Sequence, residues 1–202
     1  THDSGALVTV LGGNGADTLT GDSQNDTFDG QGGDDTLRGA GGNDTLRGGP
    51  GNDTFVSEST TDGADSIDGG SDAPAAGDFD DPGDSLRYAN RSSALAVTLP
   101  ADSVVTPGGS NGAAGEGDKI ARIENVAGSA GANTITGNER ANVLTGGSVA
   151  DVLGGGGGDD SLSGFSGADT LNGGEGDDYI DGDLGADRFD GGGGDDFLAA
   201  RD

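Results

Sequence analysis

Residues 173–198 read GGEGDDYIDGDLGADRFDGGGGDDFL, a stretch made largely of glycine and acidic residues. Such a composition offers little apolar surface to bury and is typical of disordered segments. The apolar residues are nevertheless regularly spaced, because Ile180, Phe189 and Leu198 lie nine residues apart. A fixed period of this kind indicates a repeat architecture rather than disorder.

The same nine-residue unit fills two arrays. Residues 12–56 divide into five units without a gap, and residues 128–199 divide into eight. Position 1 is Gly in all thirteen units, position 6 is Asp or Asn, and position 8 is a large apolar residue. A flexible linker is the usual meaning of a composition rich in Gly and Asp, but it does not explain residues fixed at three positions.

The composition limits the kinds of molecule that the chain can bind. The chain has 202 residues and a formal net charge of -28, from 37 acidic and nine basic residues. Such a polyanion repels nucleic acid and anionic membranes, so cations are its natural partners. No apolar run is long enough to span a membrane, and the absence of cysteine excludes disulfides. With 45 glycines, little material remains for a globular core, so something else must hold the fold.

Each position of the unit has a physical role. Glycines at positions 1, 2 and 4 are expected to adopt positive φ, which turns the backbone tightly and exposes carbonyl oxygens on its concave side. The residue at position 6 adds a carboxylate to those carbonyls. Positions 7 to 9 are expected to form a short strand whose middle side chain points inward. A ligand set made only of oxygen suits Ca2+ better than Mg2+ or Zn2+.

The position-8 residues are the expected core, a layer only two side chains thick. They are Leu19, Phe28, Leu37, Leu46 and Phe55 in the first array, and Ile135, Leu144, Leu153, Leu162, Leu171, Ile180, Phe189 and Leu198 in the second.

The units match the pattern G-G-x-G-x-D-x-U-x, and the chain therefore resembles the RTX (haemolysin-type calcium-binding) nonapeptide-repeat proteins. The resemblance implies an all-β fold, a right-handed parallel β-roll solenoid whose two arrays are joined by an irregular segment of strands and loops. Two units then make one turn, so each loop stacks on the loop 18 residues later. Ca2+ would lie between stacked loops. The earlier loop supplies carbonyls 2 and 4 and the side chain at position 6, and the later loop supplies carbonyls 1 and 3 and its own position 6.

Carried onto this sequence, the resemblance implies five sites. In the first array the ligands are Gly13, Gly15 and Asp17 with Gly30, Gly32 and Asp35, and then Gln31, Gly33 and Asp35 with Gly48, Pro50 and Asp53. In the second array they are Gly156, Gly158 and Asp160 with Gly173, Glu175 and Asp178, then Gly174, Gly176 and Asp178 with Gly191, Gly193 and Asp196, and on the opposite side Phe165, Gly167 and Asp169 with Gly182, Leu184 and Asp187.

Departures from the repeat pattern predict which of the remaining loops bind Ca2+ weakly or not at all. Position 4 is Gln24, Arg140 and Val149 in three loops, which are expected to be strained or differently shaped. Position 6 is Asn133 and Asn142 in two loops, each of which loses a negative charge. Two weaker sites, carried by Asp26 with Asp44 and by Asp151 with Asp169, would bring the number of ions from five to seven. No ion is expected at loop 138–142.

The irregular segment divides the chain. We expect an N-terminal strand or minimal cap at 1–11, the first array with a decayed last repeat at 12–70, acidic and Gly-rich inserted loops with short strands at 71–118, and the second array at 119–202. The segment is expected to continue the roll with two extruded loops, and a separate compact insert is the alternative. Arg87 and Tyr88 are expected on the surface.

Catalysis finds little support, and the chain is predicted not to be an enzyme. His2 is the sole histidine, so histidine-based acid–base chemistry and zinc-protease motifs are excluded. Paired carboxylates are frequent, but the repeat accounts for them.

Two classes of function remain. The first is a secreted, extracellular bacterial protein that binds Ca2+, folds on it, and has a structural or adhesive role. The second is an accessory C-terminal module of a larger secreted enzyme, toxin or adhesin, which RTX arrays commonly accompany. The end loops of the roll each offer half a site, so head-to-tail stacking of copies into Ca2+-bridged filaments is a further expectation.

Overall fold

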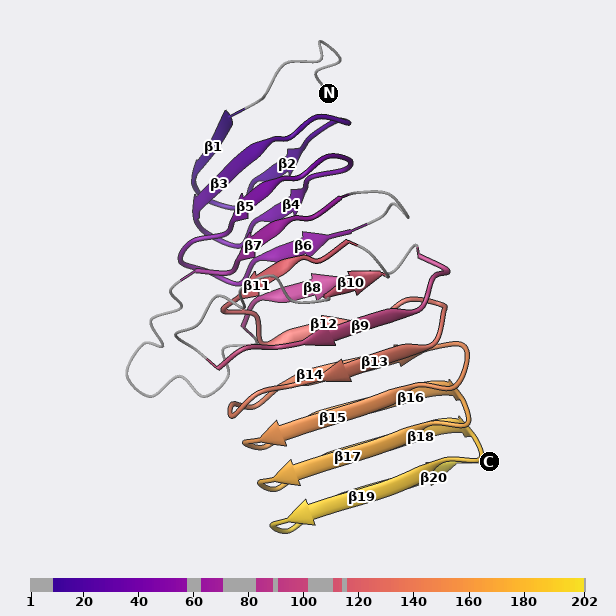
Figure 1. Cartoon of the computed structure of the whole chain (residues 1–202). Coiled ribbons are helices and arrows are strands. Elements are labelled where there is room, and N and C mark those ends of the chain that lie inside the picture. The colour runs from indigo at the N-terminus through magenta and orange to yellow at the C-terminus, as the bar shows by residue number, and fades with distance from the viewer. Residues whose placement is uncertain are drawn as a thin grey trace.

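The chain forms a parallel β-solenoid of about nine turns (Figure 1). The computed structural model describes residues 9–57, 63–70, 83–88, 91–101, 111–113 and 116–201, and these residues contain no helix. The all-β parallel roll predicted from the repeat is confirmed. Residues 1–8 of the cap predicted at 1–11 lie outside the described residues, as do residues 71–82 and 102–110, which make up most of the two predicted loops.

The roll has two faces. One face is a single nine-stranded sheet, and the other carries two sheets of five and six strands. The nine-stranded sheet consists of β2 (Thr18–Thr20), β4 (Thr36–Arg38), β6 (Thr54–Val56), β8 (Ser85–Arg87), β12 (Asn125–Ala127), β14 (Val143–Gly147), β16 (Ser161–Gly167), β18 (Tyr179–Gly185) and β20 (Phe197–Arg201). The five-stranded sheet consists of β1 (Thr9–Asn14), β3 (Thr27–Gly32), β5 (Thr45–Arg47), β7 (Ser66–Asp68) and β11 (Lys119–Ala121). The six-stranded sheet consists of β10 (Gly112–Ala113), β9 (Leu95–Thr98), β13 (Asn133–Thr136), β15 (Val152–Gly157), β17 (Thr170–Glu175) and β19 (Arg188–Gly193).

The strand register follows the predicted stacking. Within the arrays, paired residues lie 18 positions apart, as in Leu37↔Phe55 and Leu153↔Leu171. Through the irregular segment the same ladder continues with larger offsets, because Ser85 of β8 pairs with Thr54 of β6 and with Asn125 of β12. The nine-stranded sheet therefore runs through the irregular segment without a break. β10, which pairs with β9, is antiparallel.

Two rows of inward side chains form the core. All the predicted core residues of the first array are buried, as are those of the second array from Ile135 to Ile180. Phe189 is only partly buried, and the prediction for Leu198 is wrong, because 47% of its surface is exposed. Both lie in the last strands of the described stack, where no further turn covers them. The irregular segment adds buried residues that the repeat did not reveal, which are Leu86, Tyr88, Leu95, Val97, Leu99, Ile120 and Ile123.

The expectation that Tyr88 lies on the surface is wrong. Tyr88 is fully buried, and the guanidinium of Arg91 lies 5.4 Å from the centre of its ring. Arg91 is also buried, and its Nη1 donates to both carboxylate oxygens of Glu116 at 2.6 and 2.7 Å. Its other terminal nitrogen donates to Ser57. A buried cation therefore ties together three parts of the irregular segment, while Arg87 stays exposed as expected.

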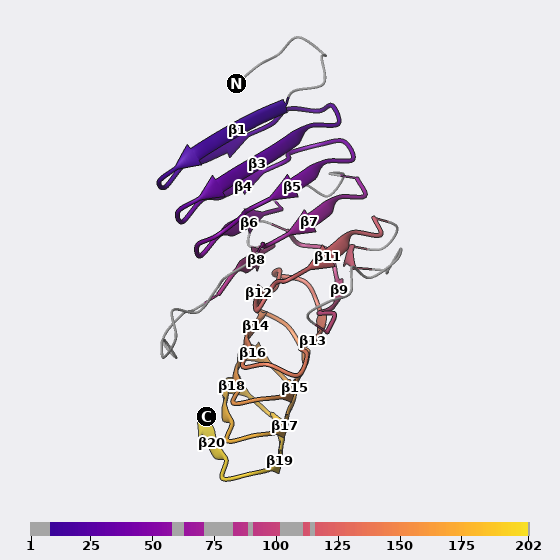
Figure 2. The same cartoon turned by 90° about the vertical axis from the view of Figure 1, so that its left-hand side faces the viewer.

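The roll bends at the irregular segment. There β9 and β11 follow each other on the same face, separated only by the short β10, so this face carries one more level of parallel strands than the nine-stranded sheet. An extra level lengthens its own side of the stack. Figure 2 shows the consequence, since the stack is convex on the side of β7, β11 and β9 and concave on the side of β8, β12 and β14.

The position-1 glycines serve a purpose different from the predicted one. None of the thirteen has positive φ, whereas Gly at positions 2 and 4 often does, as in Gly13 and Gly15. Position 1 instead needs space: a Cβ on Gly155 would lie 2.0 Å from Oδ2 of Asp160 and 2.5 Å from the carbonyl oxygen of Gly173. The missing side chain leaves room for the position-6 carboxylate of the same loop and for the loop stacked next to it.

Neighbouring glycines provide a test of this explanation. We expect Gly155→Ala to lower the free energy of unfolding by at least about 2 kcal/mol, since the clash involves backbone and a buried carboxylate. Gly154→Ala is the control, because its Cβ would meet nothing within 4 Å and its effect should stay within about 1 kcal/mol. Urea unfolding measures both. Equal losses in the two variants would contradict the steric explanation.

Candidate metal sites

The position-6 side chains form two hydrogen-bonded ladders along the roll. The backbone N–H of each donates to one carboxylate oxygen, Oδ1, of the residue one turn later. Asp17 donates to Asp35 and Asp35 donates to Asp53, both at 2.8 Å. The same bond joins Asp26 to Asp44, Asp151 to Asp169, Asp160 to Asp178, Asp169 to Asp187 and Asp178 to Asp196, at 2.7 to 3.0 Å. The structure thus brings together the position-6 side chains of every predicted site.

The loop backbones stack in the same register. Gly13 pairs with Gln31, and Gly156 pairs with Gly174. Near position 4, the N–H of Gly15 donates to the carbonyl of Gly32 at 2.6 Å, and that of Gly176 donates to Gly193 at 2.7 Å. Each carbonyl keeps a second lone pair for another partner. Predicted carbonyl ligands of successive loops therefore lie side by side.

The second carboxylate oxygen is left without a donor in four of these residues. Oδ2 of Asp35, Asp160, Asp169 and Asp178 is buried and accepts no hydrogen bond, and these side chains are at most 3% exposed. A buried carboxylate oxygen without a partner costs free energy, and a cation removes that cost. In these four residues the ladder therefore uses one carboxylate oxygen and leaves the other available to a cation.

Burial shifts the protonation of the same four carboxyl groups. Burial raises the pKa of Asp160 to about 7; the N–H of Asn142 partly opposes the shift, and the charges of Asp178 and Asp159 add to it. Burial likewise raises the pKa of Asp35, Asp169 and Asp178. Without a counterion, these carboxylates are thus poorly accommodated in their charged form.

The donor set fits Ca2+. It consists of carboxylate and carbonyl oxygens, which suit a hard cation that tolerates irregular geometry. Gln31 and Phe165 adopt the positive φ of position 2 without being glycine, so the fold imposes the turn despite its cost. No group of three or more His, Cys, Asp or Glu gathers within the described residues, so carbonyl groups must provide much of any coordination. The individual ligand assignments stay predictions.

Four loops have a different shape. In loops 22–26, 129–133, 138–142 and 147–151 the N–H of position 2 donates to the position-6 side chain of the same loop. Positions 2 and 4 have no positive φ in these loops, which include those with Gln24, Arg140 and Val149. They are therefore differently shaped rather than strained. Because one oxygen of Asp26 and of Asp151 already accepts this bond, their weaker predicted sites have fewer open lone pairs.

Sequence reasoning missed three residues of the ladders. Asp53 donates to Asp84, Asp65 donates to Asp118, and Asp84 donates to Glu124, at 2.7 to 3.0 Å. Insertions of unequal length conceal them, since their partners lie 31, 53 and 40 residues away. A local signal was present, because each acidic residue precedes an inward apolar residue by two positions, as Asp84 precedes Leu86.

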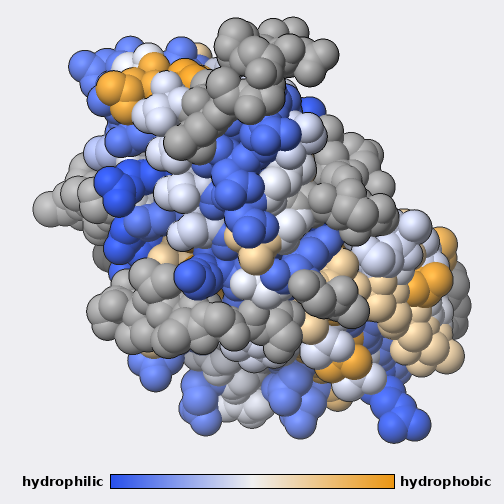
Figure 3. Space-filling view, turned by 45° about the horizontal axis from the view of Figure 1, so that its top comes forward, coloured by the Kyte–Doolittle hydropathy of each residue, from blue (hydrophilic) through white to orange (hydrophobic). Residues whose placement is uncertain are grey.

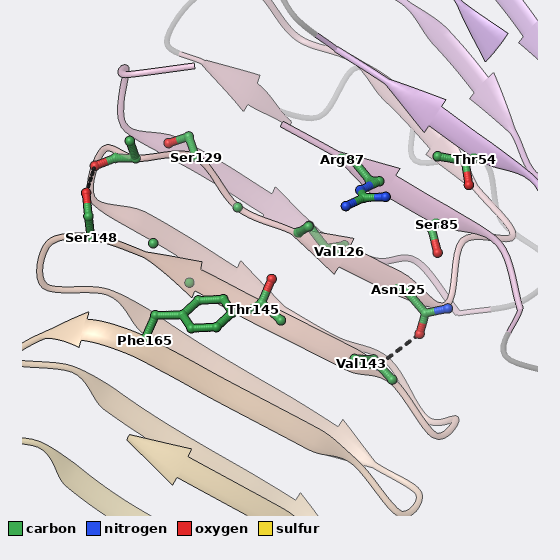
Figure 4. A pocket seen from close by; sticks show the side chains of 15 residues that line it. Thr54, Ser85, Arg87, Asn125, Val126, Ser129, Val143, Thr145, Ser148 and Phe165 are labelled. Atoms are coloured by element: carbon green, nitrogen blue, oxygen red, sulfur yellow. Dashed lines mark hydrogen bonds between the residues drawn. The ribbon is translucent and has the colours of Figure 1, made fainter. Parts of the chain in front are cut away.

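A groove of about 700 Å³ lies on the concave face of the roll. Figure 4 shows side chains from several strands of the nine-stranded sheet around it, including Arg87, Thr145 and Phe165. The described residues that line it include no His, Cys, Asp or Glu, so they offer neither a general base nor a carboxylate pair.

The raised pKa values predict a pH dependence of the metal-free roll. The unfolded chain binds fewer protons than the folded chain between the ordinary carboxyl value of 3.8 and about 7. Stability should therefore rise as pH falls through 7, and be lost as pH rises through it. We expect a stronger β signal in circular dichroism at pH 5 than at pH 8 in EGTA. Asp160→Asn should reduce the difference, because its amide cannot ionise; an unchanged wild-type spectrum would contradict the prediction.

Comparison with known families agrees with this geometry. The model of the RTX calcium-binding nonapeptide repeat matches the chain in four copies, at residues 9–37, 29–62, 127–162 and 163–198. No curated protein matches the chain. The matched residues make up more than half of the sequence and contain the loops of all thirteen repeat units. The repeat, the parallel roll and the family match lead to one conclusion: the chain belongs to the RTX calcium-binding nonapeptide-repeat family.

Proposed function

We propose that this protein is a secreted Ca2+-binding β-roll with a structural or adhesive role, which folds when it meets Ca2+ outside the cell. RTX repeats bind calcium, and RTX proteins are generally secreted. The observation that carries the proposal is the set of four buried Oδ2 atoms without donors, in Asp35, Asp160, Asp169 and Asp178. Five to seven ions at the predicted sites are part of the proposal.

Charge couples the metal to the fold. The stacked carboxylates contribute to a net charge of -28, and seven divalent ions would halve it. Because the core is only two side chains thick, it cannot offset the repulsion by itself. Binding of the metal and folding of the arrays are thus one process. Where free Ca2+ is low, as inside a cell, the arrays stay unfolded and suited to export.

Two observations support a non-enzymatic role. RTX repeats are typically structural or binding units rather than catalytic ones. The concave groove lacks groups for acid–base catalysis, and the carboxylates of the loops are engaged in the ladders.

No helix among the described residues is long and apolar enough to cross a membrane.

Calcium titration tests the proposal. We expect the circular dichroism spectrum of a disordered chain to dominate in EGTA and a β spectrum to appear cooperatively at roughly 0.1–1 mM Ca2+, the range of extracellular modules. Asp178→Ala should raise the midpoint about tenfold or more, because Asp178 serves two stacked sites. Asp190→Ala removes the same charge from the exposed face of β19 and should leave the midpoint nearly unchanged. A full β spectrum in EGTA would refute the proposal.

Head-to-tail assembly is the finer part of the proposal. The described surface seen from the β1 end is mostly hydrophilic with hydrophobic patches (Figure 3). β1 and β20 are terminal strands of their sheets, and they expose Leu11 and Phe197 by 61% and 59%. Unpaired edges with apolar side chains favour pairing with another strand. Such a contact is heterologous, so it can extend into a filament bridged by Ca2+.

Sedimentation and electron microscopy test the assembly. In millimolar Ca2+ we expect filaments or short oligomers that dissolve in EGTA. Leu11→Asp should abolish them, whereas Val152→Asp adds the same charge to an exposed residue of β15, away from the ends, and should not. Monomers of constant size with and without Ca2+ would refute assembly and leave Ca2+ binding untouched. In that case an accessory module of a larger secreted enzyme, toxin or adhesin becomes the better explanation.

A further inference from the structure

The loops between residues 128 and 151 are closed, which means that a backbone N–H at position 2 of each loop donates to the position-6 side chain of the same loop. Ser129 N–H donates to Oδ1 of Asn133 at 3.0 Å, Asn138 N–H to Oδ1 of Asn142 at 2.8 Å, and Gly147 N–H to Oδ2 of Asp151 at 2.6 Å. No residue from 128 to 151, all of which are described, has positive φ. These loops therefore lack the left-handed turns of the glycine-rich loops, for which the ring of carbonyls is predicted.

The side-chain amide of Asn133 lies where an ion would lie between stacked loops. Its Nδ2 donates to the carbonyl of Ser129 at 3.1 Å and to Oδ1 of Asp151 at 2.9 Å. These two acceptors are the position-2 carbonyl of the earlier loop and the position-6 carboxylate of the later loop, both of which belong to the predicted ligand set. The N–H groups of the amide thus bridge the same oxygens that a cation would bridge.

The hydrogen bonds of this section leave neither oxygen of the buried Asp151 carboxylate without a donor. Asp151 accepts from Asn133 N and Nδ2 through Oδ1, and from Gly147 N through Oδ2. Nδ2 of Asn142 donates to the carbonyl of Glu124 at 2.8 Å. By contrast, Asp160 in the next loop has an Oδ2 without a donor. The change from closed to open loops therefore occurs between Asp151 and Asp160.

Charge and packing also differ in the centre of the roll. From 119 to 153, Lys119, Arg122 and Arg140 balance three acidic residues, so this section is neutral, whereas residues 154–201 contain twelve acidic and two basic residues. The adjoining irregular segment adds further buried apolar residues and the buried ion pair of Arg91 with Glu116. The central section thus has neither the repulsion nor the unpartnered carboxylates that make the arrays need a cation.

We propose that the central section of the roll, built on β12, β13 and β14, stays folded without Ca2+, and that the two arrays order on it when Ca2+ binds. Amide and backbone N–H groups provide there the cross-links between turns that Ca2+ provides elsewhere, and Asn133 determines that its loop takes no ion. The inference rests on the proposed function in one respect, because it assumes that the glycine-rich loops hold Ca2+.

Hydrogen exchange of the full chain, measured by mass spectrometry in EGTA and in Ca2+, tests the proposal. Amides of residues 125–147 should be protected in both conditions, and amides of 155–193 only in Ca2+. Loss of protection throughout the chain in EGTA would overturn this inference while the proposed function stands. Full protection throughout in EGTA would overturn the proposed function as well.

One variant tests the role of the amide. Asn133→Asp replaces the donor with a carboxylate facing Asp151, and exchange of residues 125–147 in EGTA should become at least tenfold faster, with protection restored by Ca2+. Asn172→Asp adds the same charge on the exposed face of β17 and should leave these amides unchanged. Wild-type protection of Asn133→Asp in EGTA would overturn the assigned role, and failure of Ca2+ to restore protection would overturn the equivalence of amide and ion.

Discussion

The structure depends on the bond between the backbone N–H of one position-6 residue and the carboxylate of the residue one turn later. This bond sets the spacing between turns, buries the carboxylate and fixes its orientation. It uses one oxygen and, in Asp35, Asp160, Asp169 and Asp178, leaves the other buried without a donor, where a proton or a cation can satisfy it. Folding, the raised pKa values and the need for a metal all follow from this division between the two oxygens.

Much of the fold could be predicted from sequence because the repeat is strictly local. Gly, Asp and an apolar residue recur at fixed positions, so the period of nine predicts which side chains point inward and which carboxylates stack. The inward position of Leu162 and the stacking of Asp178 could both be predicted from this period alone. The irregular segment was harder, because Asp84 and Asp118 keep their places in the ladders while unequal insertions remove the period that would reveal them.

Other features depend on contacts that no local pattern encodes. The requirement for Gly155 arises from the carboxylate of its own loop and the carbonyl of the next, so only the stacked structure reveals it. Tyr88 is buried with the guanidinium of Arg91 over its ring, and the distant Glu116 holds that guanidinium in place. The closed loops looked like weakened versions of the repeat, since sequence shows the lost charge of Asn133 but not the hydrogen bonds that its amide gains.

The extra level of strands on one face has a mechanical consequence. At the level of β8 and β12 the nine-stranded sheet is continuous, whereas on the other face one sheet ends at β11 and another begins at β10. A tensile load applied along the axis of the roll is therefore carried through this level mainly by the ladder of β8 and β12. Because the opposite face is interrupted between β11 and β10, it resists bending less at this level than the continuous face does.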